Sequence, residues 1–332
     1  MMKKRTGLKI FAAVLAVLIL FLAVVNLIPP KKNVEQNPFV VQAGELPMIA
    51  AHRGGGRNNP ENTMLAFTEA VETIGVDILE SDLYLTKDGY LVFNHDAYID
   101  RTCDVNGDVP LETALENRHY IRDLTLEELR QYNFGYYFTD ETGERIYKDA
   151  EDPAAAGLQI ATADQLFAAF YESHPDLLFI VEIKDEGDRG REACRILWEI
   201  LQQYPEYLDQ IVIGTFHDEI EEELKTAYPE LLRGAPTGTA AKFVLTQYLR
   251  VNLFDSSDFA CLQIPVSYDL GVTVPLDKQT LIRRAHRRNI AVQYWTINDP
   301  DEMRHLIELG CDCIMTDDPA LLKDVLLSCA SR

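Results

Sequence analysis

The chain has 332 residues, of which 47% are hydrophobic and 25% charged, and its formal net charge is -22. This length accommodates one large domain or two small ones, and the composition is that of a folded protein with ample material for a core. Nucleic acid and anionic lipid surfaces repel such an acidic chain, so we expect no nucleic-acid partner.

The N-terminus carries an apolar run long enough to cross a membrane. Residues 10–28 are Ala, Val, Leu, Ile and Phe, with Asn26 as the only polar residue. At ~1.5 Å per residue the run reaches about 28 Å, which spans the hydrocarbon core of a bilayer. A cleaved signal peptide is the alternative, but its apolar region is usually ~7–15 residues and ends in a small-x-small site, which residues 26–30 lack. We therefore expect an uncleaved, single-pass anchor in the cell membrane.

Basic residues around this run predict its orientation. Those that precede it are Lys3, Lys4, Arg5 and Lys9, and those that follow it are Lys31 and Lys32. Because cytoplasmic flanks carry the excess of Lys and Arg, the N-terminus is expected in the cytoplasm and the remaining chain outside the cell.

The rest of the chain divides into a linker and one domain. Residues 1–30 form the basic stub and the anchor, residues 31–45 a linker, and residues 46–332 the domain. The linker assignment rests on the Pro, Lys, Asn and Gln residues of the stretch 29–42. The predicted strands of the domain are Met48–His52, Asp77–Leu83, Tyr90–Asn94, Leu178–Lys184, Ile211–Phe216, Leu231–Gly234, Cys261–Pro265, Ala291–Thr296 and Cys313–Thr316. Predicted helices between them include Asn62–Ile74, Thr162–Ser173, Arg189–Gln203, Asp218–Tyr228, Asp277–Asn289 and Asp299–Leu309. This alternation predicts a parallel sheet, either doubly wound or closed as a barrel.

Two features favour a closed (β/α)8 TIM barrel. Polar side chains follow at least five strands, at His52, Asp82, Glu182, Thr215 and Trp295, and a barrel builds its site at that end. No Gly-x-Gly-x-x-Gly follows the first strand, as a dinucleotide-binding sheet requires. Nine strands are predicted for eight barrel positions, and Tyr90–Asn94 follows the turn sequence Lys87-Asp88-Gly89, so this strand is a candidate for a local hairpin.

An irregular segment of about 104–157 interrupts the alternation. It is acidic and aromatic, and it contains one short predicted helix, Thr125–Gln131. A segment of this length between barrel elements is typical of an insertion beside the mouth that covers a substrate. A solvated excursion without such a role is the alternative.

Two carboxylates share one face of a predicted strand. Glu80 and Asp82 are separated by one residue in an apolar run, so both side chains point to the same side. They repel one another and are costly to desolvate unless a cation lies between them. Glu182, at the end of another apolar run, is a third candidate ligand. These oxygen ligands suit a hard divalent cation, Mg²⁺ or Ca²⁺.

Histidines and cationic side chains end neighbouring strands. His52 and His95 form a candidate acid–base pair, because imidazoles titrate near neutrality. Arg53, which three glycines follow, can hold a phosphate or carboxylate in a bidentate grip. Lys184 lies two residues after Glu182 and can neutralise a phosphoryl oxygen, and a structural ion pair between these two is the alternative.

Other hydrolase signatures are absent from the sequence. There is no nucleophilic serine elbow, phosphate-binding P-loop or zinc-protease motif, and the six cysteines lack zinc-ligand spacing. Glu61 begins a predicted helix, where it either reaches the site or interacts favourably with the helix dipole.

Short motifs run through the chain in a fixed order. They are His52-Arg53-Gly54, Pro60-Glu61-Asn62-Thr63, Glu80-Ser81-Asp82, Leu85-Thr86-Lys87-Asp88-Gly89, His95-Asp96, Asp100-Arg101-Thr102, Glu182-Ile183-Lys184, Tyr294-Trp295-Thr296 and Asp312-Cys313-Ile314-Met315-Thr316-Asp317-Asp318-Pro319. This ordered set resembles the glycerophosphodiester phosphodiesterase family, in the form of a membrane-anchored, bacterial-type member. The resemblance covers roughly residue 47 to the C-terminus.

The resemblance implies a (β/α)8 barrel and an enzyme of lipid metabolism. Such an enzyme uses a divalent cation to hydrolyse glycerophosphodiesters to glycerol 3-phosphate and an alcohol. The matching positions are Glu80, Asp82 and Glu182 for the metal, His52 and His95 for the catalytic acid and base, Arg53 and Lys184 for the phosphate, and Trp295 for an aromatic side chain that packs against the glycerol carbons. Which histidine is the acid, and whether a cyclic phosphate forms, do not follow from the sequence.

The sequence leaves three hypotheses for the function open. The first is a membrane-anchored glycerophosphodiesterase that acts on small, water-soluble diesters. The second is the same chemistry on a lipid headgroup or a wall polymer, in the manner of a phospholipase D, with the aromatic insertion as the contact surface. The third is a non-catalytic, membrane-tethered binding module, which the presence of both histidines and all three carboxylates disfavours.

Overall fold

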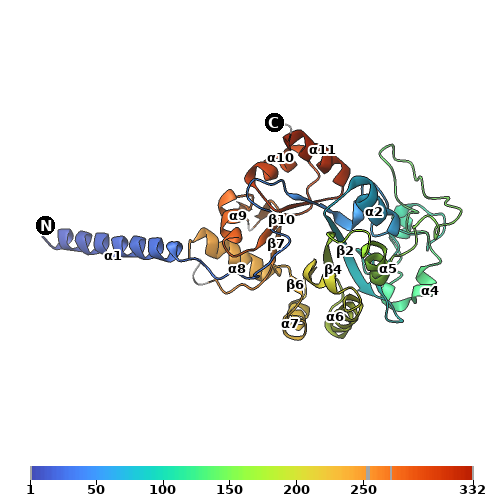
Figure 1. The fold of residues 1–332 in the computed structure, drawn as a ribbon, viewed down its shortest axis with the longest axis horizontal. Helices are drawn as coiled ribbons and strands as arrows, with labels where there is room; N and C mark the ends of the chain where they lie inside the picture. Colours follow the sequence, from blue (N-terminus) through green and yellow to red (C-terminus); the bar gives the residue numbers. More distant parts are fainter. Residues whose placement is uncertain (1, 252–254, 270, 331–332) are drawn as a thin grey trace.

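The computed structural model describes residues 2–251, 255–269 and 271–330, and its centre is a nearly closed barrel of eight parallel strands (Figure 1). The strands are β1 (Met48–Ala51), β2 (Ile78–Leu85), β4 (Leu178–Ile183), β5 (Ile211–Gly214), β6 (Leu232–Arg233), β7 (Cys261–Ile264), β10 (Ala291–Tyr294) and β11 (Cys313–Thr316). They pair in the order β6-β5-β4-β2-β1-β11-β10-β7. Two backbone hydrogen bonds between the ends of this order, from Ala235 N to Cys261 O (2.9 Å) and from Ala260 N to Arg233 O (2.8 Å), bring β6 and β7 together. The predicted barrel is therefore confirmed.

A helix follows each strand of the barrel and covers its outer side. The helices are α2 (Met64–Thr68), α5 (Ala163–Phe170), α6 (Gly187–Leu201), α7 (Asp218–Ala227), α8 (Thr237–Tyr248), α9 (Gln279–His286), α10 (Pro300–Leu309) and α11 (Pro319–Ala330). A π-helical turn, Glu69–Ile74, extends α2. Their apolar faces bury side chains such as Leu197 and Ile220 against the outward-facing residues of the strands, for example Leu79 and Val181. These contacts form the main core.

The additional predicted strand is a local hairpin. β3 (Leu91–Phe93) pairs antiparallel with β2, with Leu83 opposite Phe93, and it lies outside the order of the eight barrel strands. The turn between them includes Gly89 at φ 87°, in the left-handed region that glycine enters at little cost. A second hairpin, β8 (Ser267–Asp269) with β9 (Thr273–Pro275), follows β7. The sequence patterns did not predict this second hairpin.

The segment after β3 folds as an irregular layer with a core of its own (Figure 1). Its short helices are α3 (Leu111–Ala114), a 3-10 turn (Ile121–Asp123) and α4 (Leu126–Leu129). Its apolar core includes Ile121, Leu129 and Phe134. The Tyr147 hydroxyl donates to Asn59 Oδ1 (3.2 Å), which ties the insertion to the loop after β1. The insertion therefore lies beside the end of the barrel where the strands finish.

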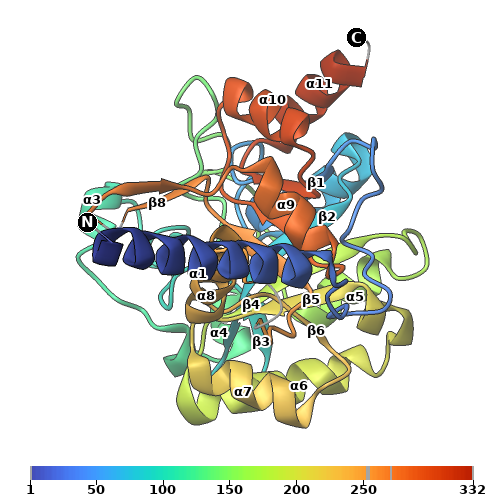
Figure 2. The ribbon, with the colours of Figure 1, turned by 90° about the vertical axis from the view of Figure 1, so that its left-hand side faces the viewer.

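The N-terminal helix α1 (Met2–Leu27) projects from the barrel beside α8 and α9 (Figures 1 and 2). Residues 9–27 of this helix are long and apolar enough to cross a membrane, and they are almost wholly exposed. The segment predicted as a linker then runs under the barrel, where Asn37 Nδ2 donates to Ala260 O (2.9 Å) and to Asn289 O (2.8 Å).

Phe39 of that segment fills the bottom of the barrel. Its side chain is fully buried. It packs with the residues that the strands point inward, among them Ala50, Ile78, Ile180 and Val212. Residues upstream of the first strand therefore contribute to the barrel core. The domain boundaries given in the sequence analysis remain a prediction.

The Phe39→Ala substitution removes a fully buried ring, so we expect it to lower the free energy of unfolding by about 3–5 kcal/mol. Urea unfolding of the full chain in detergent, followed by circular dichroism, measures this change. The matched control is Phe216→Ala, since Phe216 is 63% exposed, and we expect this control to change the free energy of unfolding by less than about 0.5 kcal/mol. Equal stability of the two variants would contradict a structural role for Phe39.

Candidate active site

Four barrel strands and the β3 hairpin bring the predicted site residues to one face of the barrel. Glu80 and Asp82 lie on β2, and the strand register places Asp82 directly beside Glu182 of β4. The other predicted residues follow strand ends, His52 and Arg53 after β1, His95 after β3, Lys184 after β4 and Trp295 after β10. Leu79 and Leu83 of β2 belong to the outer core, so the alternating carboxylates of β2 point into the barrel.

The two carboxylates of β2 are both buried. Glu80 is 4% exposed and Asp82 is 2% exposed. Burial and the charge of Asp82 raise the pKa of Glu80 to about 7. A carboxylate in this position is therefore partly protonated at neutral pH unless a positive charge is added nearby.

Lys184 lies between two of the predicted metal ligands. Its Nζ is 3.0 Å from Asp82 Oδ1 and 2.7 Å from Glu182 Oε1. Burial works to raise the pKa of Asp82, but Lys184 and Arg53 outweigh it and hold that pKa below its usual range. Burial outweighs the charge of Lys184 at Glu182, whose pKa is raised. The ammonium group thus stabilises the ionised form of Asp82 in particular.

Arg53 reaches the carboxylates with both its backbone and its side chain. Its φ is 54°, in the left-handed region, and its backbone N–H donates to Glu80 Oε2 (2.9 Å). Its Nε is 3.6 Å from Asp82 Oδ2, and its Nη1 is 3.3 Å from Glu61 Oε1. The strained backbone is consistent with a functional constraint, because non-glycine residues rarely adopt this conformation.

His52 is held by the residue that follows the last strand of the barrel. Its Nδ1 is 2.6 Å from Asp317 Oδ1, and its Nε2 faces Glu80 Oε2 at 3.9 Å. Asn298 Nδ2 in turn donates to Asp317 Oδ2 (2.7 Å). Burial works to lower the pKa of His52, but Glu80 and Asp317 outweigh it and raise that pKa. The sequence analysis did not single out Asp317, although its position directly after β11 is the signal that marks the other site residues.

His95 ends a chain of charged side chains that leads back to Glu61. His95 Nδ1 is 3.0 Å from Asp96 Oδ1, and Arg101 Nε donates to Asp96 Oδ2 (2.5 Å). The Arg101 guanidinium also donates to both oxygens of Glu61 (2.6 and 2.9 Å). Glu61 therefore reaches the site, and Arg101 and Asp96 are further members that the sequence analysis did not assign.

Trp295 follows β10 at the same end of the barrel. Its side chain is 36% exposed. Among the described residues, the Trp295 side chain takes no part in the hydrogen bonds and ion pairs given above for His52, Arg53, His95 and Lys184. Its role in the pocket therefore remains a prediction.

The network carries an excess of negative charge that suits a divalent cation. The contacts above join six carboxylates, those of Glu61, Glu80, Asp82, Asp96, Glu182 and Asp317, to three permanent cations, Arg53, Arg101 and Lys184. Asn62 Nδ2 donates to Asp82 Oδ2 (3.3 Å), which leaves Asn62 Oδ1 buried and without a hydrogen-bond partner. Buried oxygen donors in excess of cations are the set that Mg²⁺ or Ca²⁺ prefers, so the residues present fit such an ion.

A second group of potential ligands lies farther out on the same side. Among the described residues, ligand atoms of Glu186, His217 and Glu219 all lie within 4.8 Å of one another. Glu186 and Glu219 are exposed, and His217 Nε2 contacts Lys184 O (3.1 Å). Glu80, Asp82 and Glu182 do not form so tight a group, since Lys184 lies between two of them. Acidic groups on a surface often approach one another without a metal, so this exposed group is a weaker candidate than the buried carboxylates.

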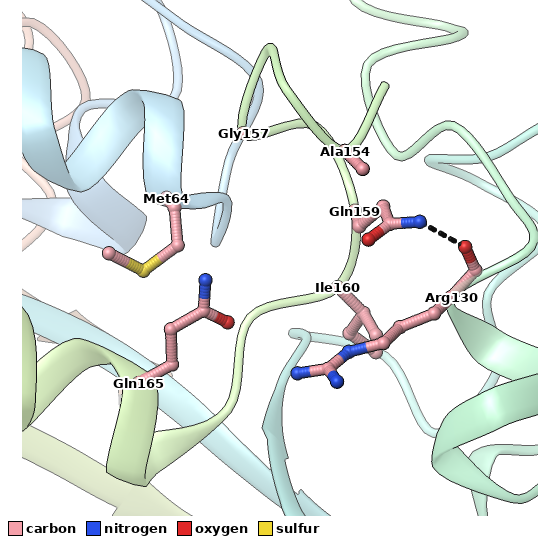
Figure 3. A pocket seen from close by; sticks show the side chains of 7 residues that line it. All are labelled: Met64, Arg130, Ala154, Gly157, Gln159, Ile160 and Gln165. Carbon is pink, nitrogen blue, oxygen red and sulfur yellow. Dashed lines mark hydrogen bonds between the residues drawn. The ribbon is translucent and has the colours of Figure 1, made fainter. Parts of the chain in front are cut away.

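A separate cavity of about 270 Å³ lies between α2, α5 and the insertion (Figure 3). It is lined by Met64, Arg130, Ala154, Gly157, Gln159, Ile160 and Gln165. The Gln159 side chain donates to the backbone carbonyl of Arg130 across it. None of the eight predicted site residues lines this cavity, so it is distinct from the carboxylate network.

Comparisons with known proteins agree with this arrangement. Residues 52–321 match the Glycerophosphoryl diester phosphodiesterase family. The chain is 27% identical over 275 residues to a glycerophosphodiester phosphodiesterase of Caldanaerobacter subterraneus subsp. tengcongensis, which covers 83% of this chain and 96% of the relative. It is 28% identical over 296 residues to the mouse lysophospholipase D GDPD1, which covers 83% of this chain and 85% of the relative.

Solved structures show the same fold. A putative glycerophosphoryl diester phosphodiesterase from Silicibacter pomeroyi has a TM-score of 0.67 at 18% identity and covers 88% of this chain and 97% of its own. An Oleispira antarctica phosphodiesterase in complex with sn-glycerol-3-phosphate has a TM-score of 0.61 at 21% identity, with coverage of 85% and 97%. Because the family match extends over most of the chain, this chain belongs to the glycerophosphoryl diester phosphodiesterase family.

Proposed function

We propose that this chain hydrolyses glycerophosphodiesters to glycerol 3-phosphate and an alcohol at the carboxyl end of the barrel. The observation that carries the proposal is the pair of buried carboxylates, Glu80 and Asp82, flanked by His52 on one side and by Lys184 on the other. An anionic diester cannot approach this excess of negative charge unless a cation offsets it. Membership of the family supports the same reaction.

Glu80, Asp82 and Glu182 are the residues that would hold the divalent cation. When bound, such an ion offsets the charge of the carboxylates and polarises the phosphoryl group for attack. Asn62 Oδ1 adds a neutral oxygen to the same surroundings. Lys184 neutralises part of the charge on Asp82 and Glu182, so it sets how much negative charge remains for the ion.

His52 and His95 carry out the two proton transfers of the hydrolysis, one as the base and the other as the acid. One imidazole takes a proton from the attacking oxygen, a P–O bond forms, and the P–O bond to the alcohol breaks as the other histidine gives its proton to the departing oxygen. Asp317 accepts from His52 Nδ1–H, which leaves Nε2 as the atom for proton transfer. Asp96 holds His95 in the corresponding way through its Nδ1.

The remaining predicted residues bind the substrate. Arg53 and Lys184 lie within reach of the carboxylate pair, so their positive charges meet phosphoryl oxygens that approach it. Arg53 Nε is buried without a hydrogen-bond partner, so one of its donors is available for such an oxygen. Trp295 offers an apolar face for the glycerol carbons at the end of β10.

We also propose that α1 anchors the enzyme as a single span of the cell membrane, with the barrel outside the cell. The length, the apolar composition and the exposure of residues 9–27 support a span. The basic residues that precede it support the orientation.

We rank small, water-soluble diesters first among the substrate classes, because the family that the chain matches is that of glycerophosphoryl diester phosphodiesterases. A lipid headgroup is the second candidate, since the chain carries a potential anchor and is similar to a relative named a lysophospholipase D.

We expect the full chain in detergent to release glycerol 3-phosphate from glycerophosphocholine with Mg²⁺ or Ca²⁺ and not with a chelator. Release from lysophosphatidylcholine alone would favour the lipid reading, and release unaffected by the chelator would contradict the metal assignment.

The His52→Ala and Glu80→Ala variants test the acid–base and metal assignments. Loss of the imidazole removes a proton transfer that is worth roughly 10²–10⁴-fold in rate, and loss of the carboxylate removes a ligand of the cation. We expect turnover of glycerophosphocholine to fall by at least this factor, while circular dichroism stays unchanged. His305→Ala is the control, because His305 pairs with Asp277 at an exposed position. Normal turnover in either site variant would refute the assignment.

Asp317→Ala tests the positioning of His52. Without the carboxylate, the ring loses the partner that fixes its tautomer, so we expect kcat to fall by roughly 10²-fold with little change in KM. Steady-state kinetics on glycerophosphocholine separate the two constants. The control is Asp301→Ala, whose side chain is 91% exposed. A change in KM alone would show that Asp317 acts on substrate binding instead.

A further inference from the structure

Four arginines gather where the N-terminal helix meets the barrel. Arg250 follows α8, Arg283 and Arg284 lie on α9, and Arg287 follows α9. We call these four residues the arginine patch. Among the residues that the structure describes, the carboxylates of this flank pair elsewhere, Asp255 with Arg288 and Asp312 with His286, and no carboxylate oxygen lies within 4.0 Å of the patch. The patch is therefore a concentration of uncompensated positive charge on a strongly acidic protein.

Three arginines of the patch line a cavity of about 310 Å³. Its walls are Gln247, Tyr248, Arg250, Thr280, Arg283 and Arg284. Arg284 Nη1 is buried and has no hydrogen-bond partner, although its Nη2 donates to Asn26 Oδ1 (2.7 Å). A buried donor of a charged group that lacks an acceptor is costly. Burial, followed by the charges of Arg250 and Arg287, lowers the pKa of Arg284, so this group favours an anion beside it.

The same residues hold the end of the apolar helix. Asn26 Nδ2 donates to Arg250 O (2.8 Å), and Arg287 Nη2 donates to Asn26 O (3.1 Å) and to Ile28 O (3.2 Å). Residues 9–27 form the candidate span, so Asn26 lies at its boundary. Groups hydrogen-bonded to that boundary lie at the depth of the lipid headgroups. This placement rests on the proposed anchoring of the chain by α1.

Apolar side chains border the patch on α8. Leu245 is 58% exposed and Leu249 is 59% exposed, and Tyr248 lies between them in the wall of the cavity. Exposed aliphatic and tyrosine side chains beside basic residues are the combination that favours the interface of an anionic bilayer. The α8–α9 flank therefore differs in character from the acidic remainder of the chain.

We propose that the arginine patch binds the phosphate of an anionic phospholipid headgroup, and that this contact seats the α8–α9 flank against the bilayer. Guanidinium groups bind phosphate oxygens in a bidentate way, and Arg250, Arg283 and Arg284 all line the cavity. The helix tethers the protein, while the patch fixes which flank of the barrel faces the membrane. The bound headgroup is separate from the substrate, since none of the catalytic residues lines this cavity.

The test is hydrogen–deuterium exchange of the full chain in nanodiscs, with phosphatidylcholine alone or mixed with phosphatidylglycerol. We expect the amides of α8 and α9 to exchange more slowly when phosphatidylglycerol is present. The Arg250→Gln/Arg283→Gln variant removes two charges but keeps the hydrogen bond from Arg284 to Asn26, and we expect it to lose this protection. The charge-matched control is Arg191→Gln/Arg195→Gln on the exposed face of α6, which keeps the protection.

Three results would overturn the proposal. These are equal exchange in the two lipid mixtures, protection that persists in the double variant, and equal protection by inorganic phosphate in detergent micelles, which would assign the cavity to a free anion. The anchor is tested separately, since release of the chain from membranes by alkaline carbonate would refute the span itself. Unchanged hydrolysis of glycerophosphocholine by the double variant in detergent shows that the barrel is folded.

Discussion

The site depends on the burial of two carboxylates on one strand. Glu80 and Asp82 are almost completely removed from water, and each raises the cost of ionising the other. The neighbouring groups compensate for this cost. Lys184 lies between Asp82 and Glu182, and the backbone N–H of Arg53 donates to Glu80. Where compensation is incomplete, as at Glu80, the remaining negative charge suits the divalent cation that we propose for this site.

The barrel makes this arrangement possible because its strands end at one face. Parallel strands present alternate side chains to the interior, so short acidic motifs on β2 and β4 come into direct register. The loops that follow the strands then bring in histidines and arginines from segments that are distant in the sequence. The interior below is closed by apolar side chains, including Phe39 from the segment before β1. The polar groups are thus concentrated at the mouth, while the apolar base supports the strands that carry them.

Much of the fold and of the candidate site follows from local patterns. Alternation of apolar runs with amphipathic stretches predicted the barrel, and the single-residue spacing of Glu80 and Asp82 predicted a shared face. Elements with weak patterns escaped prediction. The β8–β9 hairpin is short and partly exposed, so no periodicity marks it. Residues 31–45 were predicted to be a linker, because a single phenylalanine in a short segment of mixed composition carries no periodic signal.

By itself, the sequence determined that Glu80 and Asp82 share one face of a strand and that His52, Glu182 and Lys184 lie at strand ends. Those properties depend on neighbours one to four residues away, which set strand alternation and helix periodicity. Only the tertiary structure decided which side chains contact one another across the chain. Asp317 meets His52 across 265 residues, and Arg284 meets Asn26 across 258. Such contacts exist only after the barrel has closed and the chain has folded back under it, since closure, rather than local spacing, sets the distance between segments far apart in the chain.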